Sequence, residues 1–398
     1  ESGLPLRVGD FLRSLDQIVN TAIEKEVDLV IFAGDAYKDR NPQPTFQRAW
    51  GERMMKLSRA GIPTLLLIGN HDIAPAEGRA HTLQEYATLA VPHIFVADRL
   101  KLWRPEEIGV PVQVLAIPWV TRSRLLARKD LTGKTTTEIY DAIHERLEES
   151  LEQVLDQDID PSLPLILTAH ASIQGAQYGS ERLVMLGQDL ILNKSLVSDP
   201  RIDYVALGHI HKHQVLGEQP PVIYSGSIER IDFGESREVK GFVLATVERG
   251  RAQYEFVPLD TRPFVDCPIV IAEEDGFMDV IMENLPRPEQ IAGAICRLRL
   301  EYPFKFDALL DERLIRGQFT EAFDLRIVKH RVAEDRTRTG SLVAVETLGP
   351  YELLDHYWRL KSREEEEIDE LLALATEVLN IHAPGPRVND LDGSATET

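Results

Sequence analysis

The first 260 residues alternate short apolar runs with longer amphipathic stretches, and this alternation constrains the fold more than any other feature of the sequence. The apolar runs are typical of buried strands and cover 28–34, 64–69, 112–118, 164–170, 204–209, 221–226 and 241–247. The amphipathic stretches have helical spacing and cover 10–25, 43–60, 80–89, 136–156 and 181–190. Because strands and helices that alternate in this way pack as layers, the pattern favours an α/β fold.

Several of these apolar runs end in a side chain that can bind a metal ion. The segments are IFAGDAYKDR, LIGNHDIAP, LTAHASIQG and ALGHIHKH, and the side chains are Asp35, Asn70, His71, His170, His209 and His211. Open α/β sheets place their chemistry at the ends of strands. Carboxylate, amide and imidazole ligands together suit Mn²⁺, Zn²⁺ or Fe²⁺. No thiolate belongs to the set, so a structural zinc site is not expected.

A glycine precedes the polar residue in three of the four segments, at Gly34, Gly69 and Gly208. Glycine permits a sharp turn and a close approach of two backbones. His209 and His211 are two residues apart, so at a strand end they can face the same pair of metals. The GNHD segment is the most specific of the four, because an amide, an imidazole and a carboxylate in a row have no packing role.

The order GD, GNHD, H and GHxH resembles that of the calcineurin-like metallophosphoesterases. The resemblance implies a two-sheet sandwich flanked by helices, with a two-metal site at the strand ends. It implies that Asp35 bridges the two metals, and that His211 binds one of them. The ligands implied for the other metal are Asn70, His170 and His209. His71 would be the general acid that protonates the leaving oxygen, with Asp72 as its orienting partner.

The same family has an earlier motif, an Asp and a His one residue apart at the end of the first strand. The sequence begins with ESGLPLRVGD, just before the first amphipathic stretch, and has no such motif ahead of Asp35. We therefore expect the first strand and its motif to lie upstream of Glu1. A non-catalytic scaffold that pairs with an ATPase is the alternative if that motif is truly absent.

Three longer segments resemble the SbcD nucleases, the branch of this family that processes DNA double-strand breaks. They are VIYSGSIERIDFGE at 222–235, HASIQGAQYGSE at 170–181 and LPLRVGDFLRSLDQIV at 4–19. The resemblance implies Mn²⁺-dependent cleavage of DNA, as a 3′–5′ exonuclease on duplex ends and an endonuclease on single strands or hairpins. It also implies an SbcC-type ATPase partner in a two-plus-two assembly. The helices expected at 10–25 and 43–60 are our candidates for the dimer contact.

The pattern changes near residue 262 and again near residue 348. We expect a metallophosphoesterase domain at 1–262 and a small α/β DNA-capping domain at 263–347. The second domain has strands at 268–274, 294–302 and 323–332, with helices at 276–284 and 307–322. An SbcC-binding helical region at 348–383 and a disordered tail at 384–398 follow.

The apolar stripe of the last helix, which starts in EEEE at 364–367, has two interpretations. It includes Ile368, Leu371 and Leu372. It could pack on its own domain or receive helices of a partner.

Composition narrows the class of protein only a little. The net charge of −21 argues against a simple electrostatic binder of nucleic acid. However, residues 348–398 hold 12 acidic and 4 basic side chains, so −8 of that charge belongs to the end of the chain. No apolar run approaches the roughly 18 residues of a membrane span. With two cysteines, Cys267 and Cys296, in no metal-type cluster, we expect a reducing cytoplasmic setting near the nucleoid.

Basic side chains near the motifs are candidates for contacts to DNA phosphates, which position a nucleic acid without reading its sequence. The candidates are Lys38, Arg40, Lys212, His213 and Arg230. For each, a solvated surface side chain is the alternative. The main alternative for the whole chain is another phosphodiesterase of the same family that acts on a small phosphodiester.

Overall fold

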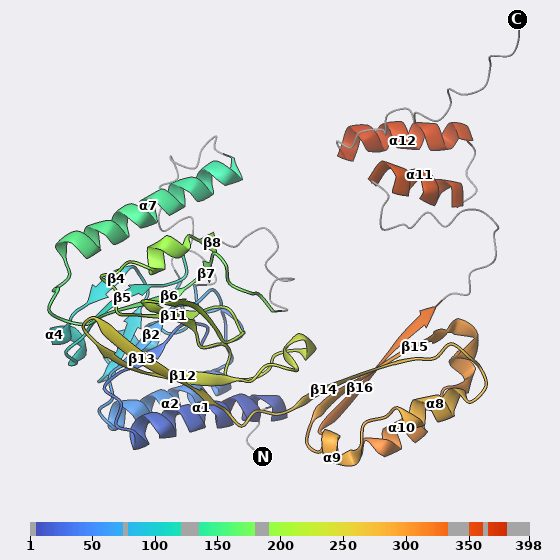
Figure 1. Ribbon diagram of the computed structural model, residues 1–398, viewed down its shortest axis with the longest axis horizontal. Helices are drawn as coiled ribbons and strands as arrows, with labels where there is room; N and C mark the ends of the chain where they lie inside the picture. Colours follow the sequence, from blue (N-terminus) through green and yellow to red (C-terminus); the bar gives the residue numbers. More distant parts are fainter. Residues whose placement is uncertain are drawn as a thin grey trace, which may run out of the picture. The chain divides into compact units, whose positions relative to one another are not determined.

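A computed structural model describes residues 5–74, 79–120, 135–179, 191–332, 350–360 and 365–379. The chain divides into two compact units, residues 1–332 and residues 333–398. Figure 1 shows the order of the elements along the chain. The helix expected at 181–190 lies outside the described residues.

The first sheet is parallel and has the strand order β1-β2-β3. Its strands are β1 (Val30–Phe32), β2 (Thr64–Leu67) and β3 (Ile94–Ala97). Two helices, α1 (Leu6–Glu24) and α2 (Pro44–Arg59), cover one of its faces. Leu15 and Val19 of α1 and Met54 and Leu57 of α2 are buried in one apolar cluster with Leu66. These helices begin and end within a few residues of the predicted ranges.

The second sheet has the strand order β10-β11-β9-β6-β5-β4, and its four central strands run parallel. The strands are β4 (Lys101–Trp103), β5 (Gln113–Ile117), β6 (Leu165–His170), β9 (Tyr204–Gly208), β10 (Gln214–Glu218) and β11 (Pro221–Tyr224). Helix α7 (Thr136–Gln157) lies along its outer face. The sequence did not predict β4 or β10, which are short edge strands with half-exposed side chains.

The two sheets pack face to face because successive residues of the central strands point to opposite sides. Leu115 and Leu167 point toward α7, where they meet Leu147 and Leu151. Ile166, one residue away from Leu167, lies in the layer between the sheets with Leu65 and Leu67 of β2. The two-sheet sandwich flanked by helices is therefore confirmed.

Shorter elements complete this part of the chain. They are α3 (Gln84–Thr88), α4 (Pro105–Ile108), β7 (Ser172–Ile173), β8 (Ile191–Leu192), η2 (Lys194–Val197), η3 (Phe233–Glu235) and the hairpin of β12 (Gly241–Glu248) and β13 (Arg251–Pro258). Within the described residues, no helix is both long and apolar enough to cross a membrane.

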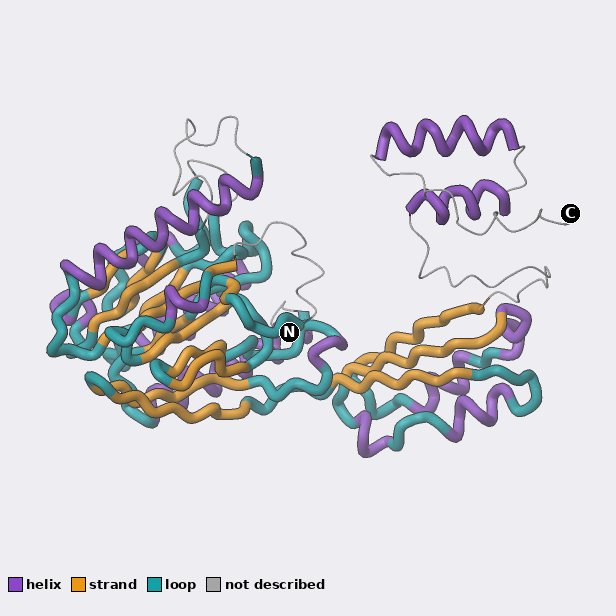
Figure 2. The backbone as a smooth tube through the Cα atoms, turned by 45° about the horizontal axis from the view of Figure 1, so that its top comes forward, coloured by secondary structure: helices purple, strands orange, loops and turns teal. Residues whose placement is uncertain are grey.

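Residues 264–332 form a three-stranded parallel sheet with an apolar core of its own. Its elements are β14 (Phe264–Val270), α8 (Phe277–Glu283), α9 (Pro288–Ile291), β15 (Ile295–Pro303), η4 (Phe304–Leu309), α10 (Glu312–Gln318) and β16 (Asp324–Val332). The helices lie on one face of the sheet (Figure 2). The predicted order of elements is confirmed, with two corrections. The first strand begins at Phe264, four residues before its predicted start. The helix expected at 307–322 is divided into the 3-10 helix η4 and the α-helix α10.

The second unit contains α11 (Pro350–Leu360) and α12 (Glu365–Leu379), which contact each other. Ile368 and Leu372 of the predicted stripe are buried, while Leu374 and Tyr357 are more than half exposed. The stripe therefore packs in part within its own unit. Its predicted contact with an ATPase stays a prediction.

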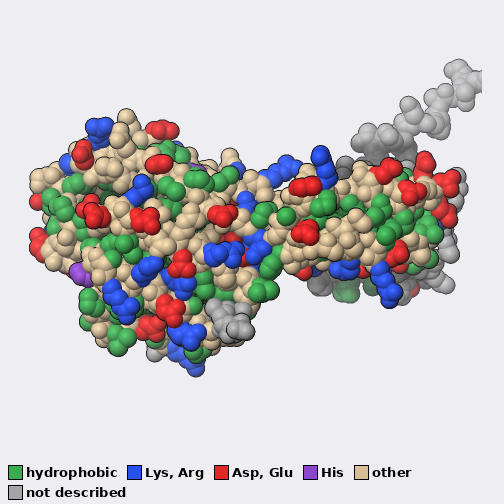
Figure 3. All heavy atoms as spheres, turned by 90° about the horizontal axis from the view of Figure 1, so that it is seen from below, with side chains coloured by type: hydrophobic (Ala, Val, Ile, Leu, Met, Phe, Trp, Pro, Cys, Tyr) green, Lys and Arg blue, Asp and Glu red, His purple; other side chains and the backbone are tan. Residues whose placement is uncertain are grey.

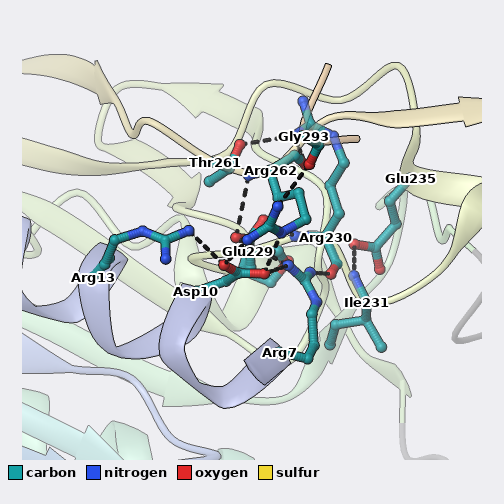
Figure 4. Close-up of polar contacts among 11 residues, drawn as sticks. Arg7, Asp10, Arg13, Glu229, Arg230, Ile231, Glu235, Thr261, Arg262 and Gly293 are labelled. Carbon is teal, nitrogen blue, oxygen red and sulfur yellow. Dashed lines mark hydrogen bonds and ion pairs between the residues drawn. The ribbon is translucent and has the colours of Figure 1, made fainter. Parts of the chain in front are cut away.

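A cluster of charges around the buried Asp10 joins α1, the segment after β11 and the segment just before β14 (Figure 4). The fully buried Asp10 carboxylate accepts hydrogen bonds from Arg7 (2.8 Å), from Arg262 (2.6 and 2.7 Å) and from Arg13. Arg262 also donates to the Gly293 carbonyl (2.6 Å) and lies over the Phe323 ring. Arg262 thus connects the sandwich to the smaller sheet.

We expect Asp10→Asn to destabilise the protein by on the order of 3 kcal/mol near neutral pH, because the substitution removes the buried counter-charge of three guanidinium groups. Burial raises the pKa of Asp10, but Arg262, Arg7 and Arg13 outweigh it and hold the pKa well below its usual range. This stabilisation is present above the unfolded-state value of about 3.9 and is lost as the pH falls below it. Urea unfolding of the variant and the natural chain should therefore differ less near pH 3 than near pH 7.

Asp16→Asn is the matched control, because Asp16 lies on the same helix and pairs with Arg53 (2.7 Å) at the surface. We expect it to cost less than about 1 kcal/mol. Equal effects of the two substitutions would contradict a special role for the buried cluster.

Candidate metal centre

Strands from both sheets deliver the predicted metal ligands to one place. Asp35 follows β1, Asn70 follows β2, His170 ends β6 and His209 directly follows β9. β1 pairs with β2, and β6 pairs with β9 so that His170 lies opposite Gly208. Because neighbouring parallel strands end at the same edge of their sheet, the four loops meet there.

The side chains of Asp35, His170 and His209 form a group whose candidate ligand atoms all lie within 4.8 Å of one another. His170 Nε2 lies 3.2 Å from Asp35 Oδ2 and 3.0 Å from Asn70 Oδ1. Asn70 Oδ1 also lies 3.1 Å from His209 Nδ1. Four of the five predicted metal ligands are therefore together.

The chemistry of these atoms fits a bound cation. His170 Nδ1 lies 2.6 Å from the Ala33 carbonyl oxygen, which accepts only, so Nδ1 carries the proton. In a neutral ring, Nε2 then has a lone pair directed at two oxygen acceptors, Asp35 Oδ2 and Asn70 Oδ1. The repulsion between these lone pairs is removed when a metal ion binds between them or when the His170 ring is protonated. Imidazole oriented by a carbonyl is the usual form of a metal-binding histidine.

The electrostatics of the site favour a negative Asp35. Burial raises the pKa of the Asp35 carboxyl, but the His170 ring and the His71 main-chain NH outweigh it and hold the pKa well below its usual range. Burial lowers the pKa of His170, and the Asp35 carboxylate opposes that effect and raises it overall. Trp119 covers the two imidazoles, with ring centroids 6.0 Å from His170 and 5.0 Å from His209. The sequence analysis missed Trp119, since nothing near it in the chain marks it.

The backbone is strained at two of the ligands. Asp35 has φ of 60° and His209 has φ of 99°, conformations that residues other than glycine rarely adopt. Such strain is typical of sites that the surrounding structure holds in one geometry.

His71 lies in the loop after β2 and is exposed, and its main-chain NH donates to Asp35 Oδ1 (2.9 Å). Asp72 is fully buried and does not have the position that we predicted. Its carboxylate accepts from the main-chain NH groups of Asp35 (2.6 Å), Ala36 (3.0 Å) and Gly69 (2.9 Å). Burial and the nearby Asp35 charge raise the pKa of Asp72 to about 6. Asp72 therefore supports the two ligand loops, which corrects its predicted role as the partner of the His71 ring.

The glycines before the ligands are needed because the loops touch. A Cβ atom on Gly69 would overlap the Asp35 carboxylate, and one on Gly208 would overlap the Ala33 carbonyl. Gly208 has no positive φ and ends β9, so of its two expected roles, a turn and a close approach, it has the second.

We expect Gly208→Ala to cost about 1–3 kcal/mol, because the new methyl group must displace the backbone that leads to Asp35. Chemical unfolding measures this. Gly9→Ala is the control, since Gly9 lies in α1 with open space around its Cβ position. In a helix that change should stabilise the chain by roughly 0.5–1 kcal/mol. A neutral effect of Gly208→Ala would refute the close contact.

His211 is not in the group of ligands found among the described residues. Its Nδ1 lies 2.8 Å from Oε1 of Glu235, a fully buried carboxylate that the sequence analysis missed. Glu235 is 24 positions further along the chain, inside the segment IDFGE, so no local spacing indicates the contact.

Two of the predicted DNA contacts have structural roles instead. The Arg230 guanidinium donates to Thr261 Oγ1 (2.7 Å) and to the carbonyls of Arg262 and Glu238, which places it inside the buried cluster of Figure 4. The His213 ring stacks on Phe256, with centroids 4.0 Å apart, and its Nδ1 lies 2.8 Å from the Tyr224 carbonyl. These positions correct both predictions.

Three other predicted contacts remain at the surface. Lys38 is exposed, and Lys212 donates to Gln177 (2.7 Å). Arg40 donates to the Asn70 carbonyl (3.2 Å) and lines a pocket of about 400 Å³ that Arg79 and His81 also line. On the face drawn in Figure 3, basic and acidic side chains are interspersed.

Comparisons with known proteins agree with this geometry. The profile of the family described as calcineurin-like phosphoesterase matches residues 8–213, just over half of the chain. The SbcD component of the nuclease SbcCD of Escherichia coli strain K12 is 26% identical over 244 residues, and the protein of the same name from Escherichia coli O157:H7 matches equally. The matched part spans 60% of this chain and 60% of those relatives.

One solved structure overlaps 61% of this chain and 93% of its own, with 14% identity and a TM-score of 0.34.

Proposed function

Because the chain belongs to the calcineurin-like phosphoesterase family, we propose that it is a metal-dependent DNA nuclease of the SbcD type. The observation that carries the proposal is the group of a partly exposed Asp35 and the buried His170 and His209, with Asn70 between the two imidazoles. A phosphoesterase of this family acts as a hydrolase on phosphate esters. We infer the DNA substrate from the similarity of this chain to the SbcD component of the nuclease SbcCD.

Two divalent ions, with Mn²⁺ expected, would bind at this site. Asp35 would bridge the pair, and His211 would bind one ion. Asn70, His170 and His209 would bind the other. When bound, the ions supply the positive charge that stabilises the attacking and leaving oxygens of a phosphodiester.

His71 would supply the proton for the leaving oxygen. Its exposure gives access to a substrate, and its main-chain bond to Asp35 fixes the loop beside the metal ligands. A histidine is suited to this step because its ordinary pKa is close to neutrality. Arg40 and Lys38 would contact DNA phosphates next to this loop.

We further propose the wider features of the SbcD nucleases. These are exonuclease action from 3′ to 5′ on duplex ends, endonuclease action on single strands or hairpins, and work in the cytoplasm at the nucleoid. The partner would be an SbcC-type ATPase that binds residues 348–383, in a two-plus-two assembly whose dimer contact uses α1 and α2. The exposed Tyr357 and Leu374 on the described helices of that region support a protein contact.

Hydrolysis of linear duplex DNA and of a small aryl phosphodiester, each with Mn²⁺, tests the proposal. We expect release of nucleotides from the duplex ends, together with a requirement for the metal. Cleavage of the small diester alone would favour a small-molecule phosphodiesterase. Metal binding without cleavage of either substrate would favour a scaffold for the ATPase.

A further inference from the structure

The predicted ligand His211 contacts two buried charged residues, Glu235 and Lys240. The Glu235 side chain has no exposed surface, and that of Lys240 is 1% exposed. Lys240 Nζ lies 2.9 Å from Glu235 Oε2 and donates to the His211 carbonyl (3.0 Å). Glu235 Oε1 faces His211 Nδ1 (2.8 Å). Glu235 therefore contacts the ring of His211, and Lys240 contacts the main chain of the same residue.

Burial of an ammonium group and a carboxylate is costly unless each is fully paired. Here Glu235 uses one oxygen for His211 and the other for Lys240 and the Ile231 main-chain NH (3.0 Å). Lys240 also pairs with Glu238 (2.7 Å). Replacement of a buried ion pair by apolar residues of similar volume is often neutral or stabilising, so packing alone does not account for these charges.

We propose that Glu235, held by Lys240, is a positioning residue that orients His211 toward its metal ion. A carboxylate that accepts from Nδ1 fixes the tautomer whose Nε2 carries the lone pair, and it makes that nitrogen a stronger ligand. His170 obtains the same orientation from the Ala33 carbonyl. This inference rests on the proposed two-metal function, because it assigns His211 to one of the two ions.

Calorimetric titration of the metal-free full chain with Mn²⁺ tests the proposal directly, without DNA. We expect Glu235→Gln to weaken one of the two binding steps by about 10–100-fold and to leave the other step unchanged. Glu238→Gln is the matched control, because Glu238 pairs with the same Lys240, whereas the carboxylate that faces the His211 ring belongs to Glu235. It should change both steps by less than about twofold. Equal weakening by both variants would contradict the proposal.

A merely structural role predicts a different result. In that case Glu235→Gln would lower the melting temperature while the folded protein kept both Mn²⁺ affinities. Glu235→Asp gives a second reading, since it keeps the charge and shortens the side chain. We expect Glu235→Asp to have an intermediate affinity for Mn²⁺. Natural affinity in both Glu235→Gln and Glu235→Asp would overturn the proposal.

The double variant Glu235→Gln with His211→Ala further separates the positioning role of Glu235 from a merely structural role. Once the His211 ring is absent, Glu235→Gln should have no additional effect on Mn²⁺ binding, because the group that it orients is gone. An additive loss would contradict the positioning role. A natural chain that binds Mn²⁺ in two steps but cleaves no DNA would refute the proposed function and leave this inference standing.

Discussion

Asp35→Asn is expected to reduce Mn²⁺-dependent hydrolysis by roughly 10³-fold or more. The substitution removes the one carboxylate in the ligand group, and a bound metal contributes several kcal/mol to the transition state, at about 1.36 kcal/mol for each tenfold. The amide oxygen of Asn can still accept the His71 main-chain NH, so the loop should keep its shape. Initial rates on duplex DNA, with Mn²⁺ affinity measured in parallel, give both effects.

Asp39→Asn is the control for Asp35→Asn. Asp39 is exposed, lies four residues further along the same loop and carries the same charge. It should leave the rate within about twofold. Activity of Asp35→Asn within roughly tenfold of the natural chain would remove Asp35 from the metal site.

His71→Ala is expected to lower cleavage by a factor on the order of 10²–10⁴ while Mn²⁺ binding stays unchanged. The alanine keeps the main-chain NH that binds Asp35, so only the ring is lost. The two readouts therefore separate proton transfer from metal binding. Unchanged cleavage would end the role of His71 as the acid.

His93→Asn is the control for His71→Ala. His93 is also exposed but precedes β3, and its positive φ of 63° is one that asparagine tolerates. We expect natural rates and natural metal affinity from this variant. Loss of cleavage in both variants would point to a general effect of histidine loss.

The fold was largely predictable because its strands are short apolar runs that end in recognisable residues. The runs predicted at 64–69, 112–118 and 164–170, which form β2, β5 and β6, needed only the pattern of hydrophobic residues. The strands that were missed, such as β4 and β10, lie at sheet edges. β4 and β10 have half-exposed side chains and no continuous apolar run, whereas β3 (Ile94–Ala97) is an apolar run of only four residues that was also missed.

The candidate site was predictable to the same extent and for a related reason. Asp35, Asn70, His170 and His209 each stand where a strand ends, so strand order brings them together within each sheet, and the packing of the two sheets brings the two pairs together. Asp72 and Arg230 were harder, because a buried charge and an exposed one look alike in a sequence. Their main-chain partners come from loops far along the chain.

The sequence by itself determined the layered α/β fold and the donors at the strand ends, because hydrophobic period and residue chemistry are local properties. Only the tertiary structure decided which charges are buried and what they hold. It moved Arg230 from a DNA contact into the cluster around Asp10, and it placed Glu235 against His211. Such roles depend on burial and on pairing across long chain separations, and both exist only once the chain has folded.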